Sequence, residues 1–254
     1  MKKRTIDILM TVTMLFLMAY QVTGEMLHEW IGIAMTVLVI THHILNRKWH
    51  ASLFKGKYNP YRSATSAASI LLTASFALTA FCGMAMSGYA VPFLYGMAPV
   101  SFARRFHLSM SHWSFVLMGI HLGLHIPVIF AKLRQKKTLM TVLTVLFTLA
   151  SGYGLYLFLQ NKIPDYMFFR TPFAFLDYEK PKALVIGENF LMLIFWVFSG
   201  TQIAELCTGR GKEKSRILPV VLLLAAVVTA LLLSRLAGDP GAAASEGNWM
   251  EQGW

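Results

Sequence analysis

Apolar runs of roughly 20 residues, about the length of a helix that crosses a lipid bilayer, recur along almost the whole chain. Only 14% of the residues are charged, whereas an ordinary soluble domain carries roughly a quarter. The pattern predicts an all-α integral membrane protein with about seven transmembrane helices. The predicted helices span residues 6–23, 27–45, 64–86, 106–130, 139–159, 183–206 and 217–236.

The net charge of +11 comes from Lys and Arg residues that gather in the loops. The segments 2–4, 47–62, 132–137 and 210–216 hold 16 of the 23 Lys and Arg residues. Because positive residues concentrate on the cytoplasmic side of membrane proteins, we expect a cytoplasmic N-terminus and an extracytoplasmic C-terminus. The same distribution explains the charge without nucleic acid as a partner. The tail 238–254 is expected to be disordered and extracytoplasmic.

Seven of the eight histidines fall on the predicted second and fourth helices. His28 and His42 lie 14 residues apart, and the same spacing separates His107 from His121. At 3.5 residues per turn this spacing puts both members of a pair on one helix face, with a rise of roughly 21 Å between them. The topology runs both helices from outside to inside, so His28 lies level with His107. His42 then lies level with His121. Each level offers two imidazoles to a haem iron, and a six-coordinate iron suits electron transfer.

Small residues beside these histidines are expected to let a flat macrocycle approach the helices. Gly32 lies about one turn from His28. Gly119 and Gly123 flank His121.

Basic residues near each level are candidates to pair with haem propionates. Arg104 and Arg105 are expected near the outer level. Arg47, with Lys48 and Arg62, is expected near the inner level, where the concentration of positive charge on the cytoplasmic side explains it equally well.

The inner ligand pair has two rivals. His43 points about 100° away from its neighbour His42, and His125 lies one turn beyond His121. Either rival is an alternative inner ligand. The other histidines, His50 and His112, are interpreted as interfacial or hydrogen-bonded.

The motif segments resemble known families. Two histidines 14 residues apart on the second and fourth helices resemble the cytochrome b of respiratory quinol oxidoreductases. The segments HEWIGIAMTVLVITHHILNRKWH (28–50) and ARRFHLSMSHWSFVLMGIHLGLH (103–125), with FKGKYNPYR (54–62) between them, resemble more specifically the flavinylation-associated cytochrome domain, a bacterial and archaeal membrane family. The resemblance covers residues 1–131; the later helices match only in being apolar.

The resemblance implies a di-haem, cytochrome b-like domain in a prokaryotic cytoplasmic membrane. Two non-covalent b haems would carry electrons from quinol or a cytoplasmic donor to an extracytoplasmic acceptor that often carries covalent FMN. By match to the family's motif, the ligand candidates are His28, His42, His107 and His121. His112 departs from the aromatic residue expected there. The tail shows no threonine flavinylation motif, so FMN is expected only on a partner, and a quinone is a further candidate ligand.

The chain is accordingly divided into the di-haem domain (1–131), three additional transmembrane helices (132–237) and the tail. The predicted outer loop, 161–182, is rich in aromatic residues. It is interpreted as an interfacial belt. The functional alternatives are a docking surface for an electron-carrying partner and a lid over a quinone site.

A histidine-box, non-haem iron oxygenase or desaturase is the main competing hypothesis, because imidazole suits iron and several histidines gather near the cytoplasmic side. It leaves His28 and His107 unexplained. A transporter or structural anchor with incidental histidines leaves the repeated spacing of 14 residues unexplained.

Overall fold

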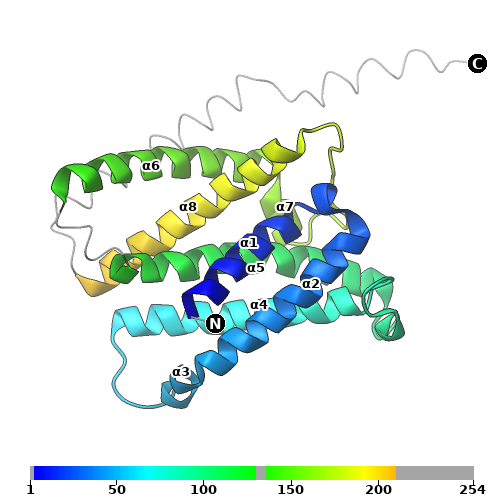
Figure 1. Ribbon diagram of the computed structural model, residues 1–254, viewed down its shortest axis with the longest axis horizontal. Coiled ribbons are helices and arrows are strands. Elements are labelled where there is room, and N and C mark those ends of the chain that lie inside the picture. Colours follow the sequence, from blue (N-terminus) through cyan, green and yellow to red (C-terminus); the bar gives the residue numbers. More distant parts are fainter. Residues whose placement is uncertain (1–2, 130–135, 210–254) are drawn as a thin grey trace, which may run out of the picture.

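The computed structural model describes residues 3–129 and 136–209 (Figure 1). Helix accounts for 80% of them and no strand occurs among them, which confirms the all-α class. The elements are α1 (Lys3–Met18), α2 (Tyr20–Leu45), α3 (Arg47–Ser52), α4 (Pro60–Met84), η1 (Pro92–Leu94), α5 (Val100–Ile129), α6 (Lys137–Gln160), α7 (Ile163–Met167) and α8 (Lys182–Thr208). The predicted helix 217–236 and the tail 238–254 lie outside the described residues.

The long helices form a bundle in which α2, α5 and α8 run one way and α4 and α6 run the other (Figure 1). One end, here called the α3 end, holds α3 and the starts of α4 and α6. The other, the α7 end, holds the loop 85–99, α7 and the segment 168–181. The α2 and α5 helices therefore run in the same direction, as the predicted membrane topology implies.

Within residues 3–129 and 136–209, four helices are long and apolar enough to cross a membrane: α2, α4, α8 and residues 138–160 of α6. The α1 helix has 16 residues and rises only about 24 Å. The α5 helix has 30 residues and carries four histidines and two arginines. On α6, Val142, Leu146 and Leu149 are 50–60% exposed, as side chains facing lipid are. These features indicate a multi-pass membrane protein; seven crossings stay a prediction.

Several helix ends differ from the sequence expectation. The first helix ends at Met18 rather than at residue 23, and α2 is kinked at Gly24, whose φ of +68° suits glycine. The α4 helix begins at Pro60, four residues before the predicted start. Asn59 caps it, because its side-chain oxygen accepts a hydrogen bond from the Arg62 backbone N–H at 2.8 Å.

The centre of the bundle is the contact between α5 and α8, where the two backbones touch through glycine. A Cβ atom at Gly123 would lie 2.1 Å from the Val197 carbonyl oxygen, and one at Gly119 would lie 2.5 Å from Trp196 Cβ. The expectation that Gly119 and Gly123 face a macrocycle is therefore wrong. They serve close helix packing, the other common use of small residues in membrane bundles.

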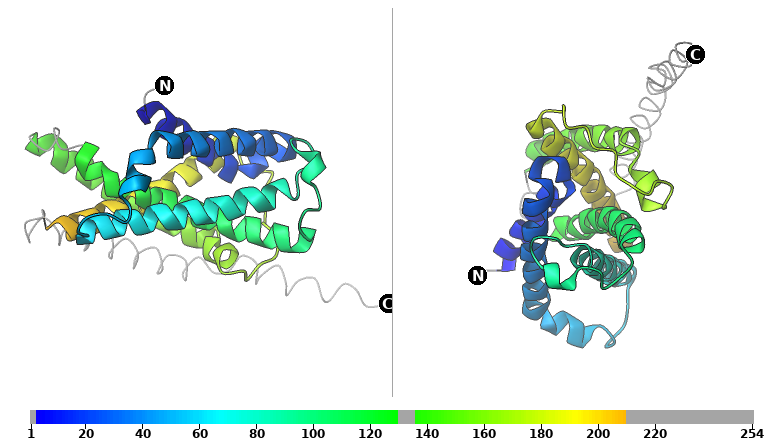
Figure 2. Two further views of the ribbon diagram at one scale, coloured as in Figure 1. Left: turned by 90° about the horizontal axis from the view of Figure 1, so that it is seen from below. Right: turned by 90° about the vertical axis from the view of Figure 1, so that its right-hand side faces the viewer.

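The main apolar core lies among α1, α2, α5, α6, α7 and α8, and includes Phe115, Met118, Leu157 and Met192. The α2 helix packs along α1 but meets α4 and α8 at only a few positions. Seen from two further directions, the α1–α2 hairpin lies along one side of the bundle (Figure 2). The predicted boundary at residue 131 falls between α5 and α8 in the sequence. Because these two helices pack against each other, residues 1–131 and the later helices share one core.

Candidate functional site

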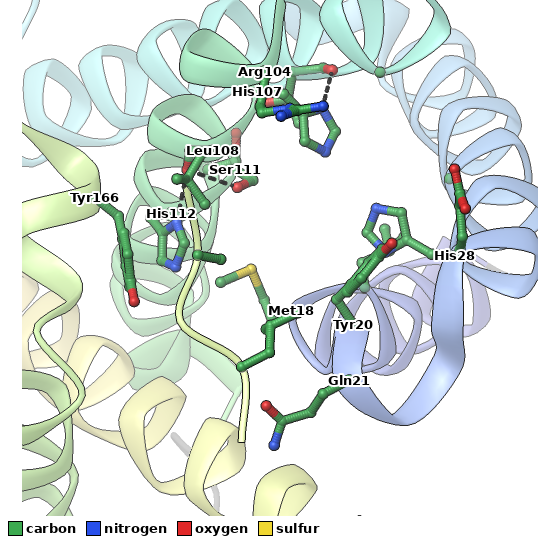
Figure 3. A pocket seen from close by; sticks show the side chains of 18 of the residues that line it. Met18, Tyr20, Gln21, His28, Arg104, His107, Leu108, Ser111, His112 and Tyr166 are labelled. Atoms are coloured by element: carbon green, nitrogen blue, oxygen red, sulfur yellow. Dashed lines mark hydrogen bonds between the residues drawn. The ribbon is translucent and has the colours of Figure 1, made fainter. Parts of the chain in front are cut away.

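The imidazoles of His28 on α2 and His107 on α5 face each other near the α7 end. Their ring centroids lie 6.0 Å apart, with the ring planes inclined at 72°. Both rings line a cavity of about 1010 Å³ between α2, α4, α5 and the α7 end (Figure 3). The level pairing of these two histidines, expected from their positions on parallel helices, is present in the structure.

The His107 ring is held from behind by α4. Its Nδ1 donates to the Thr79 carbonyl oxygen at 2.9 Å, which leaves Nε2 as the nitrogen with a free lone pair. A Cβ atom at Gly83 would lie 3.1 Å from His107 Cε1, so a larger residue at 83 would press on the ring. A backbone acceptor on the far nitrogen is the usual support of a metal-binding histidine.

The His28 ring approaches from α2 with Tyr20 beside it, the ring centroids 5.1 Å apart. The Leu17 backbone is close enough to interact with the His28 ring, yet buried His28 Nδ1 forms no well-aligned hydrogen bond with the described residues. A buried polar atom without a partner is uncommon and calls for an explanation, such as a group bound at the site.

Glu29, the residue after His28, fixes the α7 end of α2 to the loop that follows α4. Its carboxylate accepts hydrogen bonds of 2.7–3.0 Å from Ser87 Oγ and from the backbone N–H groups of Gly88, Tyr89 and Ala90. Charge-assisted bonds of this kind are stronger than neutral ones. These four hydrogen bonds, here called the Glu29 clamp, therefore set the position of the His28 side chain along the axis of the bundle.

The spacing of the two rings fits an iron between them. Two metal–imidazole bonds of about 2.0 Å, plus the distance from each nitrogen to its ring centre, put the two ring centroids roughly 6 Å apart. Axial ligation of a haem requires two such rings and a cavity for the macrocycle. The His28 and His107 rings have a spacing compatible with such ligation, and both line the cavity.

Two other candidates, Gly32 and Arg104, line the same cavity. Arg104 lies three residues before His107 within α5, so the two side chains share a helix face. Arg105 is exposed and is not among the lining residues. Because α5 begins at Val100, both arginines lie inside the helix rather than before it.

The basic residues expected at the inner level lie at the α3 end. Arg47 is exposed at the start of α3. The Arg62 guanidinium is hydrogen-bonded to the carbonyl oxygens of Ser52, Lys55 and Lys57, at 2.6–3.2 Å. Arg62 therefore holds the loop between α3 and α4.

His42 lies at the α3 end of α2, in contact with α1. Its Nδ1 is 2.9 Å from Asp7 Oδ1, and its Nε2 is 3.2 Å from the Asn46 side-chain nitrogen. His43 faces elsewhere: its Nδ1 is 3.0 Å from His50 Nε2, and its Nε2 is 3.4 Å from Thr73 Oγ1. Both nitrogens of His43 thus have partners outside any shared site with α5.

On α5, His121 Nδ1 lies 3.3 Å from Ser69 Oγ on α4. Its ring contact is with His125, the centroids 4.9 Å apart. The His42 ring is close enough to His121 and His125 to interact electrostatically. The structure thus gathers these histidines at one end of the bundle but does not bring His42 and His121 face to face, as it does His28 and His107.

The cavity continues past the His28–His107 pair along α5 to His112 and Tyr166. The His112 ring is 8% exposed, and its Nδ1 donates to the Leu108 carbonyl oxygen at 2.7 Å. Tyr166 of α7 packs beside it, with ring centroids 5.1 Å apart and planes inclined at 31°. Figure 3 shows both rings on the opposite side of the cavity from His28.

Residues of the predicted aromatic outer loop wall this part of the cavity. Phe173 and Phe175 line it, and an ion pair between Lys180 Nζ and Glu188 Oε1, 2.6 Å long, lies at its border. Both phenylalanines are also more than half exposed on the outside, as are Phe168 and Tyr178. The exposed rings are consistent with an interfacial belt, and the rings that line the cavity are consistent with a cover over it.

Among the residues that the structure describes, no group of three or more His, Cys, Asp or Glu side chains converges as a metal site would. Comparisons with protein-family models, with curated proteins and with solved structures find no match. The site is therefore interpreted from its own geometry.

Four residues that support the predicted ligands escaped the sequence analysis: Asp7, Glu29, Thr79 and Gly83. Asp7 and Glu29 carried a signal, since a carboxylate within an apolar run is expensive and usually has a function. Thr79 acts through its backbone and Gly83 through a missing side chain. Neither role leaves a mark in the sequence.

Proposed function

We propose that this protein transfers electrons across a membrane through two bis-histidine b-type haems. The observation that carries the proposal is the pair of facing rings, His28 and His107, 6.0 Å apart at the edge of a cavity. Each haem, when bound, would supply reversible one-electron chemistry at iron. Two axial imidazoles leave that iron no open position, which suits electron transfer rather than oxygen binding.

At the outer site, His28 and His107 would be the axial ligands. The Thr79 carbonyl holds the His107 ring with Nε2 free, Gly83 leaves room for it, and Glu29 fixes the helix that carries His28. Gly32 and Arg104 border the same cavity. Arg104 is the candidate partner for a propionate.

At the inner site, the proposed ligands are His42 and His121. Both have an oxygen acceptor on Nδ1, from Asp7 and from Ser69 respectively, as metal-binding imidazoles usually do. His43 is the alternative to His42: both rings have partners on both nitrogens, but only His42 has a carboxylate acceptor on Nδ1. His125 stays an alternative to His121. The inner macrocycle would require the His42 and His121 rings to turn toward each other.

The wider setting is proposed from the sequence. Seven crossings, a cytoplasmic N-terminus and an extracytoplasmic C-terminus follow from the apolar runs and the basic loops. Membership of the flavinylation-associated cytochrome family, and with it a prokaryotic membrane, is proposed from the motif segments. Electrons would pass from quinol or a cytoplasmic donor to an extracytoplasmic partner, which the family resemblance suggests carries FMN.

The proposal is tested on the purified full-length protein. We expect a Soret band, a split α band after dithionite reduction, and two haems per chain by pyridine haemochrome assay. His28→Ala and His107→Ala should each remove the same haem and leave the other. The control, His50→Ala at the opposite end of the bundle, should keep both. Loss of different haems in the two variants would refute the outer pairing.

The gathering of His42, His43, His50, His121 and His125 at the α3 end favours one competing function, a non-haem iron oxygenase of the histidine-box type. It predicts a protein without a Soret band that binds iron and loses that iron when these histidines are replaced. A preparation from haem-replete cells with neither haem nor iron would refute both redox functions.

A further inference from the structure

The imidazoles of His43 on α2 and His50 on α3 form a second pair of facing rings, at the α3 end of the bundle. His43 Nδ1 lies 3.0 Å from His50 Nε2, and neither ring lines the cavity that holds His28 and His107. We propose that this pair, here called the His43–His50 site, binds a divalent transition-metal ion, Zn²⁺ or Cu²⁺. The site leaves His42 as the inner haem ligand and does not require a haem.

The lone pair of His43 is fixed by α4. The Thr73 hydroxyl donates to the Ser69 carbonyl oxygen at 2.8 Å. Its oxygen, 3.4 Å from His43 Nε2, therefore acts as an acceptor, and the neutral ring carries its hydrogen on Nε2. The lone pair is then on His43 Nδ1, the nitrogen that faces His50. An oxygen acceptor behind the ring is the usual support of a metal-binding histidine.

The His50 ring is held by its neighbour Trp49, with ring centroids 4.9 Å apart and planes inclined at 78°. The His43 and His50 centroids are 5.1 Å apart, so the two facing nitrogens lie in the gap between the rings. Without an ion, a hydrogen on His50 Nε2 joins them. Because His50 is exposed, this hydrogen can move to Nδ1, where water accepts it. The gap then holds two lone pairs.

The distance between the nitrogens suits one metal ion. Two nitrogens on neighbouring positions of a metal, with bonds of about 2.0–2.1 Å, lie about 2.9–3.4 Å apart. The 3.0 Å between His43 Nδ1 and His50 Nε2 falls in this range. The ion would replace the shared hydrogen after a small tilt of the rings toward it. Two protein ligands leave its remaining positions to water.

The surroundings select the class of ion. Imidazole nitrogen suits Zn²⁺ and Cu²⁺, whereas Mg²⁺ and Ca²⁺ need oxygen ligands. The charged residues of α3 are Arg47 and Lys48, both exposed cations. They disfavour an ion held by charge alone, and salt screens their repulsion of an ion that is bound through nitrogen.

The position of the site gives the ion an effect on electron transfer, and this part of the proposal rests on the proposed haem function. The His42 and His43 ring centroids lie 5.9 Å apart. A divalent cation beside the inner haem stabilises the ferrous form, which has one positive charge fewer than the ferric form. The ion should therefore raise the midpoint potential of the inner haem. The outer haem, at the other end of the bundle, should keep its potential.

The test uses the full-length protein without an affinity tag, in nanodiscs. Isothermal titration calorimetry measures the affinity and stoichiometry of Zn²⁺. Electron paramagnetic resonance of bound Cu²⁺ counts the nitrogen ligands through their hyperfine splitting. Neither measurement depends on haem. The variants are His50→Ala, which removes one ligand, and Thr73→Val, which keeps both imidazoles but removes the acceptor behind His43. The control, His112→Gln, removes a histidine near the α7 end.

The wild type should bind one Zn²⁺, and Cu²⁺ should show two nitrogen ligands. His50→Ala should raise the Zn²⁺ Kd about 100-fold, because the second ligand of a chelate acts at a high effective concentration. Thr73→Val should raise the Kd about tenfold, the usual effect of losing a support behind a ligand, and keep two nitrogens on Cu²⁺. His112→Gln should match the wild type. In redox titrations, Zn²⁺ should raise the inner potential of the wild type but not that of His50→Ala.

Equal Zn²⁺ affinity in His50→Ala and the wild type would overturn the site. Three nitrogens on Cu²⁺ would also overturn it, because a histidine of another helix would then share the ion. Release of a haem by Zn²⁺ would do the same, since the ion and the haem would compete for His43. Zn²⁺ binding without a shift of the inner potential would overturn the effect on electron transfer. If the wild type binds no haem, the haem function fails, and calorimetry still decides the metal site.

Discussion

His42 on α2 and Asp7 on α1 are joined by a hydrogen bond of 2.9 Å between Nδ1 and Oδ1. The bond connects the second helix to the first near the α3 end of the bundle. An acceptor on Nδ1 fixes the orientation of the ring and puts its lone pair on Nε2, which would have to leave the Asn46 side-chain nitrogen, 3.2 Å away, to bind a metal. A carboxylate acceptor also makes the imidazole more basic. Asp7 therefore acts on the proposed inner site as a positioning residue.

Asp7→Asn should raise the midpoint potential of the inner haem and leave the outer one unchanged. A less basic axial imidazole stabilises ferric iron less, and each tenfold loss of that preference raises the potential by about 59 mV. Redox titration followed in the split α band measures both potentials.

Asp165→Asn, at the α7 end, is the matched control, because Asp165 pairs with Arg170 rather than with a histidine. It should shift neither potential. An equal shift of both haems in Asp7→Asn would contradict the assignment of Asp7 to the inner site.

Gly83→Val should remove the outer haem and leave the inner one. A Cβ atom at residue 83 would lie 3.1 Å from His107 Cε1, so the branched side chain should displace the ring from its position opposite His28. Pyridine haemochrome assay should show half of the haem lost. Gly187→Val on α8, where a Cβ would meet no atom within 4 Å, should keep both. Full haem content in Gly83→Val would mean that His107 is not an axial ligand.

The sequence predicted the features that depend on one helix at a time. The apolar runs predicted the positions of α2, α4, α6 and α8. The predicted membrane topology indicated that α2 and α5 run in the same direction. From these two results and the spacing of 14 residues, the level pairing of His28 with His107 followed. Periodicity and topology together are sufficient for such a pair.

The features that depend on contact between helices were not predictable. The sequence does not reveal that α4 lies behind His107, so the roles of Thr79 and Gly83 were missed. From the sequence, Gly119 and Gly123 are expected to face a macrocycle. A glycine allows equally close packing of a cofactor or of a neighbouring backbone, so the sequence alone does not distinguish the two. At the inner level the sequence leaves His43 and His125 as alternative ligands, and there the structure pairs His42 with Asp7 and His43 with His50.

Gly123→Ala should lower the free energy of unfolding by about 1–3 kcal/mol, the usual cost of overpacking. The new Cβ would lie 2.1 Å from the Val197 carbonyl oxygen, so α5 and α8 must separate. Unfolding in mixed micelles with increasing SDS, followed by circular dichroism, measures the change. Gly187→Ala should be neutral. If both alanine variants unfold alike, α5 and α8 do not pack through Gly123.

Glu29→Gln should loosen the loop 87–90 without unfolding the bundle. The glutamine amide keeps one acceptor oxygen and turns an NH2 group toward donors, so charge-assisted bonds worth about 1.5–3 kcal/mol each are lost. Hydrogen exchange at the backbone amides of Gly88, Tyr89 and Ala90 should accelerate about 10- to 100-fold. Glu25→Gln, an exposed carboxylate one turn earlier on α2, should leave their exchange unchanged. Unchanged exchange in Glu29→Gln as well would show that the Glu29 clamp does not hold the loop. The position of His28 along the axis of the bundle would then have to be set by the α1–α2 contact.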